Sequence, residues 1–199
     1  MNAIKTNSGS IVQDPPVARF LFSDTRFAAV WTIIRVLIGY SWLSAGWGKV
    51  NEASWMVTGE ALKGYWTNAV AIPATGHPAI TFDWYRSFIQ GMLDSGSYVW
   101  FAKLIAVGEL LVGVALILGM FVGIAAFFAA LMNWSYIMAG STSTNPLLLI
   151  GAIALILAWK TAGYYGMDRF LLPRLGTPWR NPKPASEAQP ERTRSTSVA

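Results

Sequence analysis

Three polar side chains lie inside long apolar stretches of the chain. They are Arg35, Glu109 and Asn133. A charge among apolar groups costs roughly 3 kcal/mol or more to bury, so such residues face inward, find partners and commonly mark ligand or proton paths. Counted from the ends of their stretches, Arg35 and Glu109 lie at similar heights, which predicts an ion pair between them. Such a pair serves either chemistry or the register of two helices. Arg35 and Glu109 are therefore the candidate catalytic residues.

One helical stripe leads from Arg35 to the end of its apolar stretch. Its members are spaced by 4, 3, 4 and 3 residues and are Arg35, Gly39, Trp42, Gly46 and Lys49. Small residues in such a stripe let helices approach closely in lipid. Trp42 and Trp134 lie deep in their stretches, so both are candidates to contact a flat, ring-shaped ligand.

The amino-acid composition is typical of an integral membrane protein. Of the 199 residues, 54% are hydrophobic and 13% are charged. A helix needs roughly 20 apolar residues to cross a bilayer. Four windows meet this length and predict an all-α fold, an integral membrane four-helix bundle that forms one domain over residues 27–182. The predicted spans are 27–47, 98–118, 121–139 and 147–165.

Basic residues flank the predicted bundle on both sides in sequence, at positions such as Arg19, Arg26, Arg169 and Arg174. The positive-inside rule therefore places both termini in the cytoplasm and the bundle in the inner (plasma) membrane. Residues 1–26 are expected to form a short, mostly disordered cytoplasmic tail and residues 183–199 a disordered one. No aromatic-interleaved basic patch is present, so the lipid bilayer and not nucleic acid is the expected partner.

The first connection, residues 49–97, is long and rich in aromatic residues. Within it, an apolar face recurs at a spacing of three to four residues and consists of Phe82, Tyr85, Phe88, Ile89 and Met92. This pattern predicts an amphipathic helix over residues 82–94 that lies on the outer membrane surface. Long connections of this kind are more often functional than idle.

Cysteine is absent and histidine occurs once, at His77. A disulfide relay, an iron–sulfur cluster, a thiolate metal site and a bis-histidine haem made by this chain alone are therefore excluded. We predict no metal site and no covalently bound cofactor. Redox chemistry would need an electron carrier that is borrowed or is itself the substrate.

These residues resemble the DoxX family of small four-helix membrane proteins, and within it the branch related to the small subunit of thiosulfate:quinone oxidoreductase. The segments that carry the resemblance are RVLIGYSWLSAGWGKV, GELLVGVALILG and the stretch from NWSYIMAG to RLGTPW, and the likeness extends over about residues 27–179. The family's polar positions fall on Arg35, Lys49 and Glu109.

The resemblance implies electron transfer from thiosulfate to a diffusible quinone, in a complex with a second oxidoreductase subunit. On that interpretation, a dianion would bind at three cations: Lys49, Lys103 and Arg86. A quinone would lie near Trp42, Trp134 and Tyr136, with Asn133 and Arg35 as donors to its carbonyls. Glu109 would supply protons, although a nearby arginine favours the ionised carboxylate, so the ion pair and the proton role compete.

Two other functions fit the same sequence. A non-catalytic membrane subunit that holds a soluble redox partner would also need no cofactor ligands and would use the long first connection. A small anion or proton transporter would also carry intramembrane charge. The short chain lacks an inverted repeat and a helix broken at mid-membrane, which disfavours a transporter, although a homo-oligomer would supply a pore.

Overall fold

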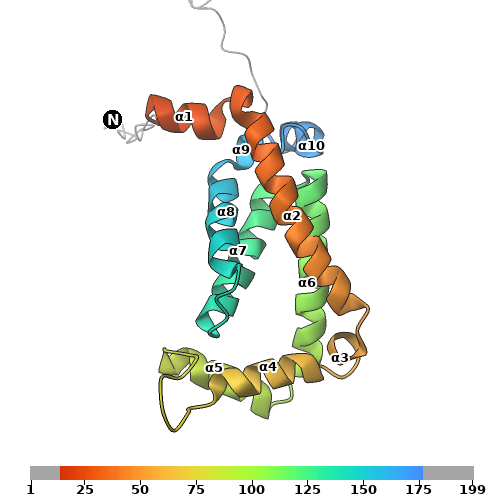
Figure 1. Cartoon of the computed structure of the whole chain (residues 1–199). Coiled ribbons are helices and arrows are strands. Elements are labelled where there is room, and N and C mark those ends of the chain that lie inside the picture. Colours follow the sequence, from red (N-terminus) through yellow and green to blue (C-terminus); the bar gives the residue numbers. More distant parts are fainter. Residues whose placement is uncertain (1–13, 177–199) are drawn as a thin grey trace, which may run out of the picture.

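The computed structural model describes residues 14–176 of the chain, and within this range all secondary structure is helical. Two helical segments are long and apolar enough to cross a membrane. These are Thr25–Val50, which contains α2 (Ala28–Val50), and α6 (Tyr98–Leu118). Two shorter apolar helices, α7 (Val122–Met138) and α8 (Asn145–Leu157), pack together with them in a helical bundle (Figure 1).

The helices α2 and α6 run antiparallel and pack closely because glycine faces the partner backbone. A methyl group at Gly46 would collide with the backbone of Leu110, and one at Gly113 would collide with that of Leu43. Gly39 faces Ile117 in the same way. These three contacts set one register along the whole pair.

The second closely packed pair is α7 and α8, whose shared core is built from small residues. The fully buried residues of this core include Ala126, Ala129, Ala152 and Leu155. By contrast, α6 packs on α7 much less extensively than on α2. The bundle therefore consists of two tight helix pairs, α2–α6 and α7–α8, with a looser seam between α6 and α7.

One end of the bundle is covered by the first connection, which folds into α3 (Ala53–Met56), α4 (Glu60–Val70) and α5 (Asp83–Asp94) (Figure 1). The helix predicted over residues 82–94 is confirmed as α5. Its Tyr85 and Ile89 are buried in a second core with Leu62 and Trp66 of α4, whereas Phe82 and Phe88 are half exposed.

The other end carries α1 (Pro16–Ser23), a 3-10 turn (Thr25–Phe27), α9 (Trp159–Ala162) and α10 (Asp168–Arg174). The prediction of an unstructured tail over residues 1–26 is wrong for α1. This helix is anchored because the Trp31 Nε1–H donates to the Leu21 carbonyl at 2.7 Å and Thr161 Oγ1 donates to the Phe22 carbonyl at 3.2 Å. Residues 1–13 and the predicted tail 183–199 lie outside the described residues.

The fourth predicted span, 147–165, is divided at Ala158 into α8 and α9. Beyond the break, Trp159 packs against Gly123 of α7, and Thr161 donates a hydrogen bond to the Phe22 carbonyl of α1. These contacts hold α9 as a separate turn. With 13 residues, α8 alone is about 20 Å long.

Candidate functional site

Glu109 is the centre of a buried polar cluster formed by three helices. Its side chain on α6 is 1% exposed. Its Oε2 lies 2.6 Å from the Lys49 Nζ on α2, and its Oε1 accepts a hydrogen bond of 2.5 Å from the Tyr136 hydroxyl on α7. Both carboxylate oxygens therefore have a donor, and the charge is balanced by Lys49.

The predicted Arg35–Glu109 ion pair is wrong. The buried Arg35 guanidinium donates through Nη1 to the carbonyl oxygens of Leu116 and Ile117, the latter at 3.0 Å. In the α2–α6 register Glu109 lies level with Gly46. Arg35 is eleven residues from that level, or about 16 Å along the helix. The prediction failed because it aligned the two spans end to end, whereas the first turns of α2 extend past the end of α6.

Arg35 instead belongs to a separate cluster at the α6–α7 turn. Its guanidinium caps the last turn of α6, whose carbonyl groups have no partner within the helix. The buried Asp168 of α10 accepts from the backbone N–H groups of Phe121 and Val122 at 2.6 and 2.9 Å, and so caps the start of α7. Burial raises the pKa of Asp168, while these two N–H groups and Arg35 act in the opposite direction.

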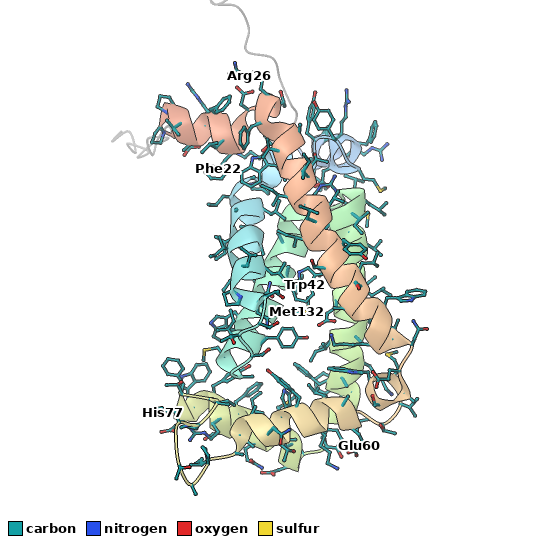
Figure 2. The ribbon with its side chains drawn as sticks, in the orientation of Figure 1. Phe22, Arg26, Trp42, Glu60, His77 and Met132 are labelled. Carbon is teal, nitrogen blue, oxygen red and sulfur yellow. The ribbon has the colours of Figure 1, made fainter. Side chains whose placement is uncertain are left out.

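A polar cavity of about 370 Å³ opens beside Glu109. Its walls come from α2, α3, α4, α6, the end of α7, the α7–α8 loop and the start of α8, and they include Trp42, Lys49, Trp55, Ser141, Thr144 and Asn145. The Lys49 Nζ also lies 5.1 Å from the centre of the Trp55 ring. The Trp42 Nε1–H is buried without a protein partner. Figure 2 shows Trp42 near the middle of the bundle.

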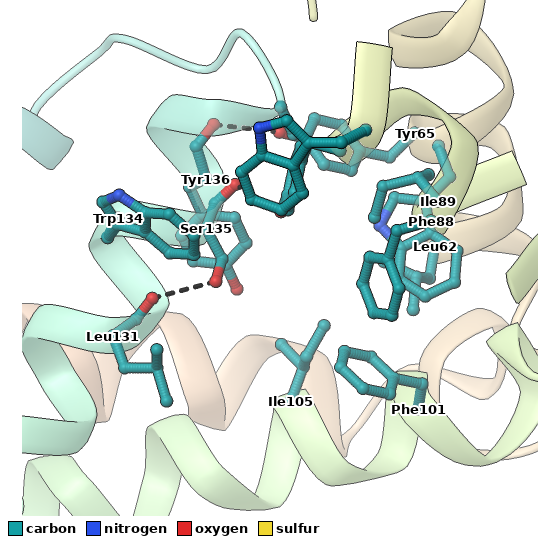
Figure 3. A pocket seen from close by; sticks show the side chains of 14 residues that line it. Leu62, Tyr65, Phe88, Ile89, Phe101, Ile105, Leu131, Trp134, Ser135 and Tyr136 are labelled. Atoms are coloured by element: carbon teal, nitrogen blue, oxygen red, sulfur yellow. Dashed lines mark hydrogen bonds between the residues drawn. The ribbon is translucent and has the colours of Figure 1, made fainter. Parts of the chain in front are cut away.

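An apolar cleft follows the seam between α6 and α7, and we name it the α6–α7 cleft. It consists of two adjoining cavities of about 320 and 410 Å³ that share Phe101, Ile105, Leu131, Ser135 and Tyr136. The first lies under α4 and α5 and is lined by aromatic residues, among them Trp66, Tyr85, Phe88 and Trp134 (Figure 3). The second extends between the two helices to Leu111 and Phe128, which are exposed on the bundle surface.

Tyr136 is the boundary between these two environments, because its side chain lines both the α6–α7 cleft and the polar cavity. Tyr65 of α4 lies at the same boundary, and its hydroxyl is 3.5 Å from the Tyr136 carbonyl oxygen. The Tyr85 hydroxyl donates to the Ser135 carbonyl at 3.0 Å. Burial raises the pKa of Tyr65 and of Tyr85, so both phenols stay neutral donors at physiological pH.

The structure brings some of the predicted site residues together and separates the others. Trp42, Lys49, Glu109 and Tyr136 surround the polar cavity, and Trp134 lines the α6–α7 cleft. Asn133 is fully buried with both amide atoms unpartnered and lines neither space.

The three cations predicted to hold a dianion do not meet. Lys49 is paired with Glu109 in the polar cavity. Arg86 is paired with Asp83 at 2.7 Å and donates to the Ile80 carbonyl. Lys103 is exposed on α6 and lines neither the cavity nor the cleft. Their separation leaves no shared anion site among these three residues.

Sequence reasoning missed several residues of the two sites. Tyr65 and Trp55 were not singled out among the many aromatic residues of the first connection. Asp168 was not recognised as a helix cap, although it is an acidic residue in an otherwise apolar and basic segment. The polar residues of the α7–α8 loop were not singled out either, although Ser141, Ser143 and Thr144 line the cavity.

Within residues 14–176, no group of three or more His, Cys, Asp or Glu side chains is placed to hold a metal ion. Comparison of the chain with protein-family models, with curated proteins and with solved structures gives no match. The polar cavity, the α6–α7 cleft and the residues between them are therefore the features of the molecule that bear on its function.

Proposed function

We propose that this protein is a membrane component of a quinone-linked oxidoreductase, with the quinone ring bound in the α6–α7 cleft beside Tyr136. One observation carries the proposal. The Tyr136 hydroxyl is bonded to a buried carboxylate, and its side chain lines both an apolar cleft and a polar cavity. A quinone needs this combination, because its tail is apolar and its carbonyl oxygens take up protons when it is reduced.

Exposed apolar side chains on all four bundle helices support a bilayer as the surrounding medium. They include Leu37 of α2, Leu111 of α6, Phe127 of α7 and Ile150 of α8. Soluble proteins rarely expose contiguous apolar surface on this scale. We propose that the four helices cross the inner (plasma) membrane with both termini in the cytoplasm. The α4–α5 end then lies outside, with α5 at the membrane surface.

The polar cluster supports a proton relay to the quinone. Reduction is Q + 2e⁻ + 2H⁺ → QH₂. When Glu109 is protonated, its O–H donates to the Tyr136 phenol oxygen, and the phenol O–H is then free to donate to a quinone oxygen. Tyr136 is the group that touches the substrate, whereas Glu109 acts through it and Lys49 holds the ionised carboxylate between turnovers.

The electron donor of the proposed reaction is thiosulfate, which is the donor that the resemblance implies. The charges of Lys49 and Arg86 are already balanced by Glu109 and Asp83. We therefore propose that thiosulfate is oxidised on a second subunit, which passes electrons to the quinone held by this chain.

The proposal is tested by binding of a photoreactive quinone analogue to the protein in lipid nanodiscs. Tyr136→Phe removes one hydrogen bond and should weaken binding by about fivefold, which corresponds to about 1 kcal/mol. Tyr40→Phe is the matched control, because Tyr40 is exposed on α2 and lines neither site. Equal affinity in all three proteins would contradict the proposal.

A turnover assay tests the relay. Membranes that contain the protein together with its second subunit should reduce a soluble quinone analogue with thiosulfate, and Glu109→Gln should abolish turnover at equal protein level while analogue binding persists. Glu109→Asp should restore part of the rate with a shifted pH profile. A purely structural Glu109 would instead lower the amount of folded protein and leave the pH profile of the remainder unchanged.

A second candidate function is a non-catalytic subunit that holds a soluble redox partner. The observation that favours it is the outer face of α4 and α5, where Glu60, Asn68, Gln90 and Asp94 form an exposed polar surface across one end of the bundle. Co-purification of a partner without any quinone binding would support this function and not the first.

A further inference from the structure

The proposed relay needs a source of protons for Glu109, and the structure bears on which side of the membrane they come from. The carboxylate is almost fully buried, and in the structure it is bonded to Lys49 and Tyr136. Glu109 lines the polar cavity but neither part of the α6–α7 cleft. Water therefore has a path to the carboxylate through the cavity and not through the apolar cleft.

The cavity has exposed lining residues at the α4–α5 end of the bundle and also at Ser41 and Ala45, on the flank of α2 that the proposed bilayer covers. Its outer wall is the α7–α8 loop, where Ser143 and Thr144 are exposed, together with Trp55 of α3 and Tyr65 of α4. The buried Trp42 Nε1–H also belongs to the cavity wall and has no protein partner. A buried donor in a polar space of about 370 Å³ is expected to be satisfied by water.

The bundle is closed between Glu109 and its other end. Apart from Asn133, the buried side chains of this layer are apolar and include Ile38, Val112, Leu116 and Leu155. Beyond them, Arg35 and Asp168 are bonded to the backbone of the α6–α7 turn. Asn133, on α7 one turn before Tyr136, is fully buried, and its amide has no hydrogen-bond partner in the protein.

We infer that Glu109 exchanges its proton with water from one compartment only, through the polar cavity at the α4–α5 end. The inference rests on the proposed function and deepens it. Both protons of Q + 2e⁻ + 2H⁺ → QH₂ then come from the α4–α5 side, and none crosses the bundle. If thiosulfate is oxidised to tetrathionate in the same compartment, turnover moves no net charge across the membrane.

The absence of cysteine from the sequence makes the inference testable by cysteine labelling without background. The reagent is a membrane-impermeant methanethiosulfonate, applied to right-side-out and to inverted vesicles. Ala45→Cys and Thr144→Cys place a thiol in the cavity wall. Asn68→Cys reports the α4–α5 side and Arg174→Cys the opposite side, because both positions are exposed. Ala152→Cys, which is fully buried, is the negative control.

We expect Ala45→Cys and Thr144→Cys to react in the same vesicles as Asn68→Cys, and Ala152→Cys to react in neither preparation. Reaction of Ala45→Cys from the Arg174→Cys side, or no reaction at all, would overturn the inference. The test does not depend on which side is cytoplasmic, because the two exposed positions define the sides.

The labelling experiment and the quinone assay can each reject one proposal without rejecting the other. Labelling as expected without any binding of the quinone analogue would leave the one-sided water access in place and remove the proposed function. Quinone turnover together with labelling of Ala45→Cys from the Arg174→Cys side would retain the function and reject the one-sided access. Labelled Ala45→Cys protein should also lose turnover while it still binds the analogue, because the adduct blocks the cavity and not the cleft.

Discussion

At the scale of single residues, the main feature is the choice of partner for each buried charge. Glu109 is neutralised by Lys49, and Arg35 by the carbonyl groups at the end of α6. A buried carboxylate that loses its cation is destabilising, whereas replacement of both partners by neutral groups of similar size is often tolerated. The Lys49–Glu109 pair should therefore behave as one unit.

Lys49→Met should lower the free energy of unfolding by about 3 kcal/mol, because it leaves the Glu109 carboxylate buried and unpaired. The double variant Lys49→Met/Glu109→Gln should recover most of this loss, since neither remaining side chain is charged. Thermal unfolding in nanodiscs measures both. Lys63→Met is the control: its partner Glu60 is exposed, and the loss should be below about 1 kcal/mol. Additive effects of the two substitutions would contradict the coupling.

At the scale of helices, packing depends on a few positions where a side chain has no room. The α2–α6 pair approaches closely at Gly39, Gly46 and Gly113. The α6–α7 turn is held by Arg35 and Asp168, with Gly119 at a φ of +67° between them. These contacts set the heights at which Lys49, Glu109 and Tyr136 meet.

Gly46→Ala should cost about 1–3 kcal/mol of stability, because the new methyl group collides with the α6 backbone at Leu110. The displaced helix should also lengthen the Lys49–Glu109 contact and reduce quinone turnover. Gly48→Ala is the matched control on the same helix, since nothing lies within 4 Å of the added carbon. It should be neutral or stabilise α2 by up to about 1 kcal/mol. If Gly46→Ala and Gly48→Ala unfolded at the same midpoint temperature, the predicted clash at Gly46 would be contradicted.

Gly119→Ala should destabilise the protein for two reasons that a control can separate. The positive φ costs an alanine about 1–2 kcal/mol, and the methyl group would also lie 2.8 Å from the Arg35 Cζ and 2.9 Å from the Gly166 Cα. Gly76→Ala carries the first cost alone, because Gly76 has a φ of +91° and open space around it. The excess loss of stability in Gly119→Ala, measured by thermal unfolding, reports the clash with Arg35 and Gly166. Equal losses in the two variants would show that the turn relaxes without cost.

At the scale of the whole molecule, the two helix pairs leave a seam that opens beside Tyr136. Tyr136 lines both spaces: the polar cavity, which also contains Trp42 and Glu109, and the α6–α7 cleft. The α4–α5 segment covers one end, with His77 in the loop that joins its two helices (Figure 2). Function is therefore expected to depend on the space between the pairs and not on either pair alone.

Gly108→Phe should abolish binding of the quinone analogue while the protein still folds. Gly108 lines the α6–α7 cleft, and the nearest atom to an added carbon is the Met132 Sδ at 3.9 Å, so the ring has room to enter the cleft. Gly91→Phe is the control, because Gly91 is exposed on α5 with open space around it. Photolabelling measures both, and unchanged labelling of Gly108→Phe would show that the quinone binds elsewhere.

Much of the helical content could be predicted from the sequence. The apolar window 98–118 matches α6, and the 3–4 spacing over residues 82–94 matches α5. Hydropathy and periodicity are properties of neighbouring residues, so they are readable without the fold. The buried positions of Arg35, Glu109 and Asn133 were predicted for the same reason, since a polar residue within an apolar helix must face inward.

Only the tertiary structure decided which of these groups meet. The register of α2 against α6 is set by glycines that admit the partner backbone at Gly46 and Gly113, and it places Lys49, not Arg35, beside Glu109. The break at Ala158 and the docking of α1 depend on contacts of Trp159, Thr161 and Trp31 with distant segments. Register and docking follow from the fit between surfaces far apart in sequence, and no local pattern encodes that fit.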